Sequence, residues 1–315
     1  MERARRFHAD EPRSQKIHMQ IRKIDKIDRI DSHHHLWRYS RQAYPWISPE
    51  MKVLERDFLP EDLEPELERH RISGSIAVQA RQTMEETSIL LAEASQHAWI
   101  RGVVGWAPIA SQSFPAILER LCEQPKLKGL RHVIQDEPDD DFILGHDFNR
   151  GIRRLHATGL VYDILIKEKH LPQTIQFVDR HPEQVFILDH MAKPRIAAQE
   201  LSPWRERIRE LAERENVYCK ISGMVTEAAW DNWNAEQLRP YYEIVLESFG
   251  PRRLMMGSDW PVCLLATSYS RWIAVLEEWI GALSAAEQSR IVGGTAVEAY
   301  RLAERPSHAP QEQPT

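Results

Sequence analysis

The sequence has few cysteines, no long apolar run and no excess of positive charge, and each of these features excludes a class of protein. Only three cysteines occur in 315 residues, far apart and odd in number, so a disulfide framework is excluded and a reducing compartment is expected. No segment reaches the roughly 18 consecutive apolar residues that a spanning helix needs. Lys and Arg number 41 against 47 Asp and Glu, which leaves no basic field for a phosphate backbone. We therefore expect a cytoplasmic protein that binds neither nucleic acid nor a membrane.

The two ends of the chain differ in composition from the rest. Residues 1–26 contain eight Lys or Arg and four acids but no apolar core, so we predict a disordered basic extension and not a secretory signal. Residues 304–315 are rich in Pro and Gln and poor in apolar side chains, so we predict a second disordered segment there. Residues 27–303 remain as one folded domain.

Within residues 27–303, short apolar, β-branched runs alternate with longer stretches in which apolar residues recur at helical spacing. This alternation is typical of repeated βα units. Eight such runs occur, at residues 27–33, 72–80, 102–109, 129–134, 161–166, 185–190, 217–222 and 254–258. Without a break in composition, eight units favour a single closed (β/α)8 TIM barrel of the α/β class. An open doubly wound sheet is the alternative, but no GxGxxG or P-loop follows the first run, which disfavours its nucleotide-binding form.

Three consecutive histidines stand at the carboxyl end of the first run. His33 and His35 are two residues apart, so on an extended strand their side chains leave the same face, whereas His34 points the other way. In a barrel, catalytic residues project from the carboxyl ends of the strands. A pair of imidazoles there suits a divalent cation or a developing oxyanion. The sequence therefore places His33 and His35 in a candidate active site.

Two further runs end in polar residues that suit the same site. His190 ends the sixth run and Asp259 follows the eighth. Taken singly, a histidine at a strand end is more often structural, and Asp259 could serve as a helix cap. Together with His33 and His35, however, they would place three imidazoles and one carboxylate at one end of the barrel, where the first and eighth strands are neighbours. We expect these four side chains to converge.

The motifs that carry these residues resemble the amidohydrolase superfamily, and more narrowly its amidohydrolase-2 branch of lactone hydrolases. They are His33-His34-His35, residues 189–194 (Asp-His-Met-Ala-Lys-Pro) and residues 257–261 (Gly-Ser-Asp-Trp-Pro). The resemblance covers about residues 27–303 and is greatest to the L-fuconolactonase- and L-rhamnonolactonase-like group.

By that resemblance, His33, His35, His190 and Asp259 would be the catalytic residues and the ligands of one divalent metal ion, with zinc favoured. A second metal is not expected, because the fourth and fifth strand ends carry Arg131-His132 and Lys167 in place of the bridging lysine and the additional histidine of larger relatives. The sequence Gly293-Gly294-Thr295 departs from the family's closing Gly-Gly-Asn and puts only a supporting contact in question.

The chemistry of lactone opening assigns a role to the carboxylate but leaves the histidines open. A lactone carbonyl needs an activated water, a base and stabilisation of the oxyanion, and Asp259 is the best candidate for the base. In one assignment the histidines and Asp259 hold a metal ion that polarises the carbonyl. In the other, no metal is needed and the histidines donate to the carbonyl oxygen directly.

Other polar and aromatic residues at the predicted rim are candidates for substrate binding. Arg131 and His132 suit a carboxylate or vicinal hydroxyls, although Arg131 could instead pair with an acid on the following loop. Lys193 could likewise bind the substrate or form a structural ion pair. Trp37 and Trp106 offer aromatic faces for a sugar ring, but packing against loops is the commoner role of a tryptophan.

The leading hypothesis is therefore a hydrolase that opens a small sugar-acid lactone such as L-fuconolactone or L-rhamnonolactone. A non-oxidative decarboxylase of an aromatic or unsaturated acid is the alternative enzyme on the same barrel. A non-catalytic binding protein is the alternative of another class, which the retention of four costly polar groups disfavours. The expected partner is a small-molecule lactone, and a homodimer is the default assembly.

Overall fold

A computed structural model describes residues 28–303, which fold into a ring of eight parallel strands. The hydrogen-bonded order runs from the first strand to the eighth without a crossover, as a βα-barrel requires. The strands are β1 (Ile30–His34), β2 (Gly74–Val78), β3 (Ile100–Gly105), β4 (Leu127–Val133), β5 (Val161–Leu165), β6 (Phe186–Leu188), β7 (Val217–Ile221) and β8 (Leu254–Met256). The predicted TIM barrel is thus confirmed, and the predicted segments 1–26 and 304–315 lie outside the described residues.

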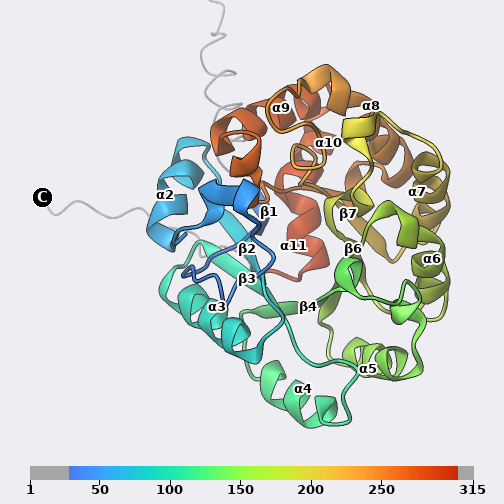
Figure 1. The fold of residues 1–315 in the computed structure, drawn as a ribbon. Coiled ribbons are helices and arrows are strands. Elements are labelled where there is room, and N and C mark those ends of the chain that lie inside the picture. The colour runs from blue at the N-terminus through green and yellow to red at the C-terminus, as the bar shows by residue number, and fades with distance from the viewer. Residues whose placement is uncertain (1–27, 304–315) are drawn as a thin grey trace, which may run out of the picture.

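The helices lie around the outside of the ring, except α11, which lies across one end of it (Figure 1). They are α2 (Pro60–Arg69), α3 (Met84–Gln96), α4 (Phe114–Cys122), α5 (His146–His156), α6 (Leu171–Asp179), α7 (Trp204–Ala212), α8 (Ala235–Phe249), α9 (Tyr269–Gly281), α10 (Ala285–Ser289) and α11 (Thr295–Ala299). Local signals set several of their ends. Pro60 opens α2, the hydroxyl of Thr83 accepts a hydrogen bond from Glu86 N at the start of α3, and Gly250 ends α8 with φ 64°.

The ring closes between β1 and β8 through the segment that follows β8. The backbone N–H of Asp259 donates to the carbonyl of His33 at 2.8 Å, and that of His35 donates to Trp260 at 2.6 Å. These two bonds alternate between the chain segments, as parallel pairing requires. The loop that carries Asp259 is therefore held directly against the histidine segment.

Two apolar clusters lie on the two faces of the strands. The larger one packs the outer helices against the ring, and its largest buried side chains include Trp204, Trp272 and Trp279. The smaller one fills one end of the barrel, where Ile76, Ile187 and Met255 meet α11 and Tyr300. Figure 1 shows α11 in the middle of the ring of strands. Apolar side chains therefore close this end of the barrel.

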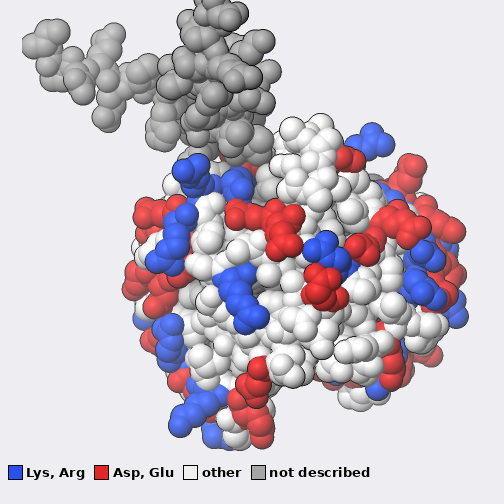
Figure 2. Space-filling view, turned by 90° about the horizontal axis from the view of Figure 1, so that it is seen from above, with Lys and Arg blue, Asp and Glu red and all other residues white. Residues whose placement is uncertain are grey.

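The eight predicted runs correspond to the eight strands, but most strands are shorter than predicted, among them the sixth and the eighth. β6 ends at Leu188 and β8 at Met256, whereas the predicted strands continue to residues 190 and 258. Among the described residues, no helix is long and apolar enough to cross a membrane. On the face drawn in Figure 2, acidic and basic side chains are interspersed with wide areas that carry neither.

Candidate active site

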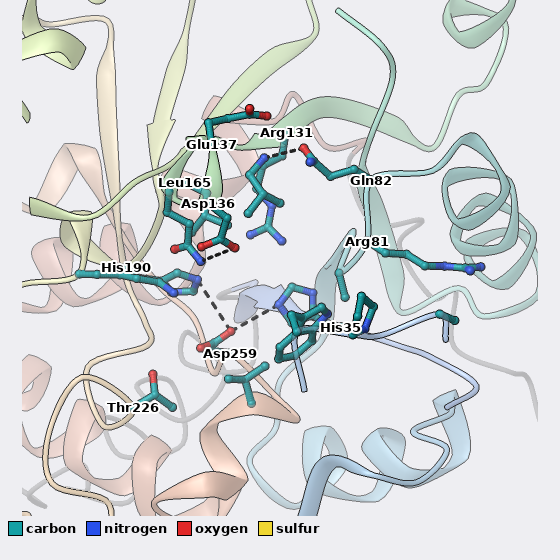
Figure 3. A pocket seen from close by; sticks show the side chains of 18 of the residues that line it. His35, Arg81, Gln82, Arg131, Asp136, Glu137, Leu165, His190, Thr226 and Asp259 are labelled. Atoms are coloured by element: carbon teal, nitrogen blue, oxygen red, sulfur yellow. Dashed lines mark hydrogen bonds and ion pairs between the residues drawn. The ribbon is translucent and has the colours of Figure 1, made fainter. Parts of the chain in front are cut away.

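A cavity of about 450 Å³ opens at the carboxyl ends of the strands. Its wall includes residues from the loops after β1, β2, β4, β6 and β8, in the position where βα-barrels bind their ligands. Figure 3 shows His35, Arg131, His190 and Asp259 around its centre. The charged and imidazole side chains in the wall are His35, Arg81, Arg131, Asp136, Glu137, His190, Lys193 and Asp259.

The four side chains that the sequence predicts to converge do so, around one carboxylate oxygen. Oδ1 of Asp259 lies 3.5 Å from Nε2 of His35 and 3.8 Å from Nε2 of both His33 and His190. The two Nε2 atoms of His33 and His35 are 3.3 Å apart. All four residues are buried, with His33 behind the cavity wall and the other three in it. The cluster therefore brings three imidazole nitrogens and one carboxylate together from three separate parts of the chain.

In His35 and His190, Nδ1 is hydrogen-bonded to a neighbouring group, and this bond fixes the orientation of each imidazole ring. Nδ1 of His35 lies 2.7 Å from the carbonyl oxygen of Val78. Because a carbonyl only accepts, Nδ1 carries the proton and Nε2 keeps its lone pair toward Asp259. Nδ1 of His190 lies 2.9 Å from the hydroxyl of Ser222. Both rings thus present Nε2 to the same point.

His190 reaches this point because the chain turns sharply after β6. His190, Met191, Ala192 and Lys193 all have left-handed backbone angles, with φ between 48° and 60°. Such angles cost non-glycine residues about 1–2 kcal/mol each and persist at functional sites where the surrounding structure enforces them. The N–H of Lys193 donates to the carbonyl of His190 at 2.8 Å and closes the turn. This turn explains why the predicted sixth strand ends early.

A buried group of two cations and two carboxylates lies behind His33. Nζ of Lys220 is 2.6 Å from Asp163 and 2.9 Å from Asp189, and Arg131 lies 2.8 Å from Asp189. Nδ1 of His33 lies 3.2 Å from Nζ of Lys220 and 3.4 Å from Oδ1 of Asp189. Because the charges of the group balance, it can be buried without an uncompensated ion. It fixes the position of His33 from behind.

Burial and neighbouring charges set the protonation states that the cluster needs. Burial lowers the pKa of His190 to about 4. Burial, together with the charge of Lys220, lowers the pKa of His33 well below its usual value. Burial alone would raise the pKa of Asp259, but the nearby imidazoles of His190 and His35 lower it below its usual range. At neutral pH, His33 and His190 are therefore neutral and Asp259 is ionised.

The donor atoms of His33, His35 and Asp259 lie within 4.8 Å of one another and fit one divalent metal ion, and His190 lies beside Asp259. A tetrahedral ion with bonds of about 2.0–2.1 Å holds its ligand atoms about 3.3–3.4 Å apart, and the donor distances given above lie between 3.3 and 3.8 Å. Neutral imidazoles and a carboxylate are the ligands of such ions in catalytic sites. A second group of possible ligands, His33, Asp189 and His190, is also close together. Lys220 and Arg131 already occupy Asp189, so the group with Asp259 is the better site.

Of the residues predicted to bind substrate, the structure brings two to the cavity wall and three elsewhere. Arg131 and Lys193 line the cavity, whereas Trp37, Trp106 and His132 do not. Trp37 is only 3% exposed, and its indole N–H donates to the carbonyl of Arg56. It packs against neighbouring aromatic rings, which is the commoner role that the sequence had left open.

His132 and Trp106 form a chain of contacts beside the cavity. Nε2 of His132 lies 2.6 Å from Glu137, and its ring stacks on Phe142. The indole N–H of Trp106 donates to Nδ1 of His132 at 3.4 Å. The two residues therefore support the loop that carries Glu137 and do not face the cavity themselves.

Sequence reasoning did not single out Arg81 and Gln82, which line the cavity directly after β2. A signal for them was present, because they follow an apolar run in the same way as His190 and Asp259 do. Trp46 also lines the cavity.

The fold and the cluster together define a class of protein: a (β/α)8 barrel with a His and Asp metal-binding site at the carboxyl ends of strands one, six and eight. A family model, described as Amidohydrolase, matches residues 30–302. The chain belongs to the amidohydrolase family.

Two curated relatives and one solved structure resemble the chain over nearly its whole folded part. An L-fucono-1,5-lactonase from Burkholderia multivorans is 45% identical over 289 residues, which cover 88% of this chain and 97% of the relative. An L-fucono-1,5-lactonase from Burkholderia ambifaria is 37% identical and covers 89% and 97%. The crystal structure of an amidohydrolase from Burkholderia multivorans with bound zinc has a TM-score of 0.84 at 44% identity, with 87% of this chain and 99% of that chain covered.

The decarboxylase alternative has only remote support. A 5-carboxyvanillate decarboxylase from Sphingomonas paucimobilis has a TM-score of 0.60 at 14% identity and covers 88% of this chain and 100% of that chain. Such a likeness shows the shared barrel and nothing about the reaction.

Proposed function

We propose that the protein hydrolyses a small sugar-acid lactone to the free acid, with L-fucono-1,5-lactone as the first candidate and L-rhamnonolactone as the second. The observation that carries this proposal is the convergence of three Nε2 atoms on Oδ1 of Asp259 beside a cavity of about 450 Å³, which suits one monosaccharide-sized ligand. The 45% identical relative, which is named an L-fucono-1,5-lactonase, supports the same substrate class.

His33, His35, His190 and Asp259 would hold one divalent ion. Their nitrogen and oxygen donors suit zinc, and the relative whose structure was solved with zinc is 44% identical. When bound, such an ion polarises the lactone carbonyl and lowers the pKa of a water molecule beside it.

Asp259 is the general base of the proposed reaction. Its carboxylate is ionised at neutral pH, lies in the cavity wall and is oriented by His35 and His190. It takes one proton from the attacking water while the oxygen of that water bonds to the carbonyl carbon. Because Val78 and Ser222 fix the two imidazole rings, the carboxylate needs little reorganisation when the water is deprotonated.

Arg131 and Lys193 are the proposed substrate-binding residues. Both Nη atoms of Arg131 have partners, Asp189 and the carbonyl of Gln79. Its Nε is buried and has no hydrogen-bond partner within residues 28–303. A buried donor without a partner costs about 1–3 kcal/mol, so we assign Nε–H of Arg131 to an oxygen of the bound lactone. Trp37, Trp106 and His132, which do not line the cavity, are assigned supporting roles.

The direct test is acid release from a panel of lactones. The purified protein is assayed with a pH indicator on L-fucono-1,5-lactone, L-rhamnono-lactones, other aldonolactones and muconolactones, after chelation and after addition of zinc or manganese. We expect turnover of six-carbon sugar lactones, loss of activity on chelation and recovery with one ion per chain. CO₂ release from hydroxybenzoates without any lactone turnover would replace this proposal with the decarboxylase. Full turnover in a metal-free preparation would remove the ion from it.

Two further expectations stay predictions. The cytoplasmic location is tested by cell fractionation, and the homodimer by light scattering of the purified protein.

A further inference from the structure

Three cationic side chains line the cavity, and two of them are hydrogen-bonded to other residues of the protein. Arg131 is bound to Asp189 and to the backbone of Gln79. Nη2 of Arg81 lies 3.1 Å from Glu85, and its side chain extends away from Asp259 in Figure 3. The third cation is Lys193.

The ammonium group of Lys193 has no hydrogen-bonded partner in the described part of the chain. Its ion-pair partner is Glu227, at 3.8 Å, which is beyond hydrogen-bond distance. The side chain is 22% exposed and lies in the cavity wall. Lys193 is therefore a cation held in place by a nearby carboxylate, with its three N–H groups free to meet a ligand.

The left-handed turn after β6 places this ammonium group beside the His and Asp cluster. Lys193 closes the turn that begins at His190 through its backbone bond to that residue. His190, Lys193 and Asp259 also line the same cavity. The backbone turn and the shared cavity wall therefore put Lys193 next to the cluster.

The strand order separates Lys193 from Arg81. Lys193 follows β6 and Arg81 follows β2, and in a ring of eight strands in sequential order these two strands are opposite each other. The cluster itself comes from β1, β6 and β8. Although β2 is the neighbour of β1, the side chain of Arg81 extends away from Asp259 (Figure 3), whereas Lys193 belongs to the turn that carries His190.

When a lactone opens, its ring oxygen is the leaving group and needs a proton. The ring oxygen leaves as an alkoxide, a strong base that must be protonated as the C–O bond breaks. This oxygen is bonded to the same carbon as the carbonyl oxygen that faces the cluster. A proton donor for it must therefore lie beside the cluster and carry an N–H or O–H group that is not engaged elsewhere.

We propose that Lys193 is the general acid that protonates the ring oxygen of the lactone. This inference rests on the proposed lactone hydrolysis. One proton of the water goes to Asp259, its hydroxyl bonds to the carbonyl carbon, and the bond from that carbon to the ring oxygen breaks. The ring oxygen takes a proton from the ammonium group of Lys193, which leaves a neutral amine and a new hydroxyl. The proton held by Asp259 then returns to Lys193 or to solvent, and the net products are the carboxylate, the hydroxyl and one proton.

The test compares substrates whose leaving groups differ in basicity. Lys193→Met and Lys193→Arg are assayed on L-fucono-1,5-lactone, which releases an alkoxide, and on dihydrocoumarin, which releases a phenoxide and needs less help from an acid. We expect Lys193→Met to lower kcat on the sugar lactone by about 10²–10³-fold, with little change in KM and a much smaller loss on dihydrocoumarin. Lys193→Arg keeps the positive charge but is a poor acid, so its kcat on the sugar lactone should fall to a similar level.

Lys167→Met is the matched control, because Lys167 is a lysine at the end of the neighbouring strand β5 that does not line the cavity. Its kcat should stay within about twofold of the wild type, and the metal content of all variants should be equal. Equal loss on both substrates, a loss confined to KM, or a Lys193→Arg variant that keeps kcat on the sugar lactone would overturn the proposal. If the wild type opens no lactone at all, the proposed function fails and not only this inference.

Discussion

Gly223 and His190 are in such close contact that a side chain on the glycine would collide with the imidazole. A Cβ atom at position 223 would lie 2.6 Å from Nδ1 and 2.7 Å from Cγ of His190. The backbone of Gly223 also has φ +66°, which L side chains rarely adopt. The loop after β7 therefore gives His190 the space in which its ring can face Asp259.

Gly223→Ala should displace the ring of His190 and destabilise the fold together. We expect a loss of stability of about 1 kcal/mol or more from the positive φ alone, and a lower affinity for the metal ion because one ligand moves. Chemical denaturation and zinc titration of the apoprotein measure the two effects. Gly281→Ala, where a Cβ would meet nothing within 4 Å, is the control: it should leave the zinc affinity unchanged and should not lower the stability. Unchanged zinc affinity in Gly223→Ala would show that His190 does not depend on this contact.

The strands were predictable because they depend on a property that the sequence displays directly. Most are apolar runs, buried by helices on one side and by the barrel interior on the other. The ends of β6 and β8 were not predictable to the residue. The left-handed turn at His190 and the positive φ of Asp259 are enforced by tertiary contacts, which local propensity does not show.

The convergence of His33, His35, His190 and Asp259 was predictable from their positions at strand ends, because closed barrels bring all the carboxyl ends together. The identity of the residues that line the cavity was less predictable. Trp37 follows β1 and His132 lies near the end of β4, but their side chains pack against the loops and do not line the cavity. The direction of a side chain after a strand depends on the loop, and the sequence alone does not give the course of that loop.

Asp259→Asn tests the general base. The substitution keeps the size of the side chain but removes its charge and its ability to accept the proton of the water. We expect kcat on the sugar lactone to fall by about 10²–10⁴-fold, with the metal content also reduced because a neutral amide is a weaker ligand. Steady-state kinetics and metal analysis of the purified variant measure these effects. Asp231→Asn, an exposed carboxylate, should leave both unchanged, and lactone turnover that survives Asp259→Asn would refute the assignment.

Lys220→Met tests the buried charge group behind His33. The substitution leaves the carboxylates of Asp163 and Asp189, both fully buried, without the cation that they share. Breaking such a pair from one side costs about 3–5 kcal/mol, which urea denaturation detects as a lower free energy of unfolding. Lys169→Met is the control: its ammonium lies 2.6 Å from Asp140, but both side chains are about half exposed, so the loss should stay below about 1 kcal/mol. Similar losses in the two variants would mean that the buried group is not a stabilising one.

Glu86 should make the stability of the protein fall as the pH rises from about 4.5 to about 7. Its carboxyl group is buried beneath the loop that carries Arg81, where it accepts hydrogen bonds from the backbone N–H groups of Ala80 and Arg81 at 3.1 and 2.7 Å. Burial raises the pKa of Glu86 from 4.5 to about 7, against the opposing effect of these bonds.

Between those two values the folded protein keeps a proton on Glu86 that the unfolded chain has lost. The free energy of unfolding therefore decreases with rising pH, by up to about 1.4 kcal/mol per pH unit, and the effect ends above the folded pKa, where both states are ionised. Glu86→Gln keeps the hydrogen-bond geometry and removes the titration, so its stability relative to the wild type should increase across this window. Denaturation of both proteins at several pH values measures the difference, in which the titration of all other groups cancels. Glu85→Gln, which removes an exposed carboxylate on the same helix, should run parallel to the wild type. A constant difference between Glu86→Gln and the wild type from pH 4.5 to 7 would show that Glu86 is ionised in the folded protein throughout.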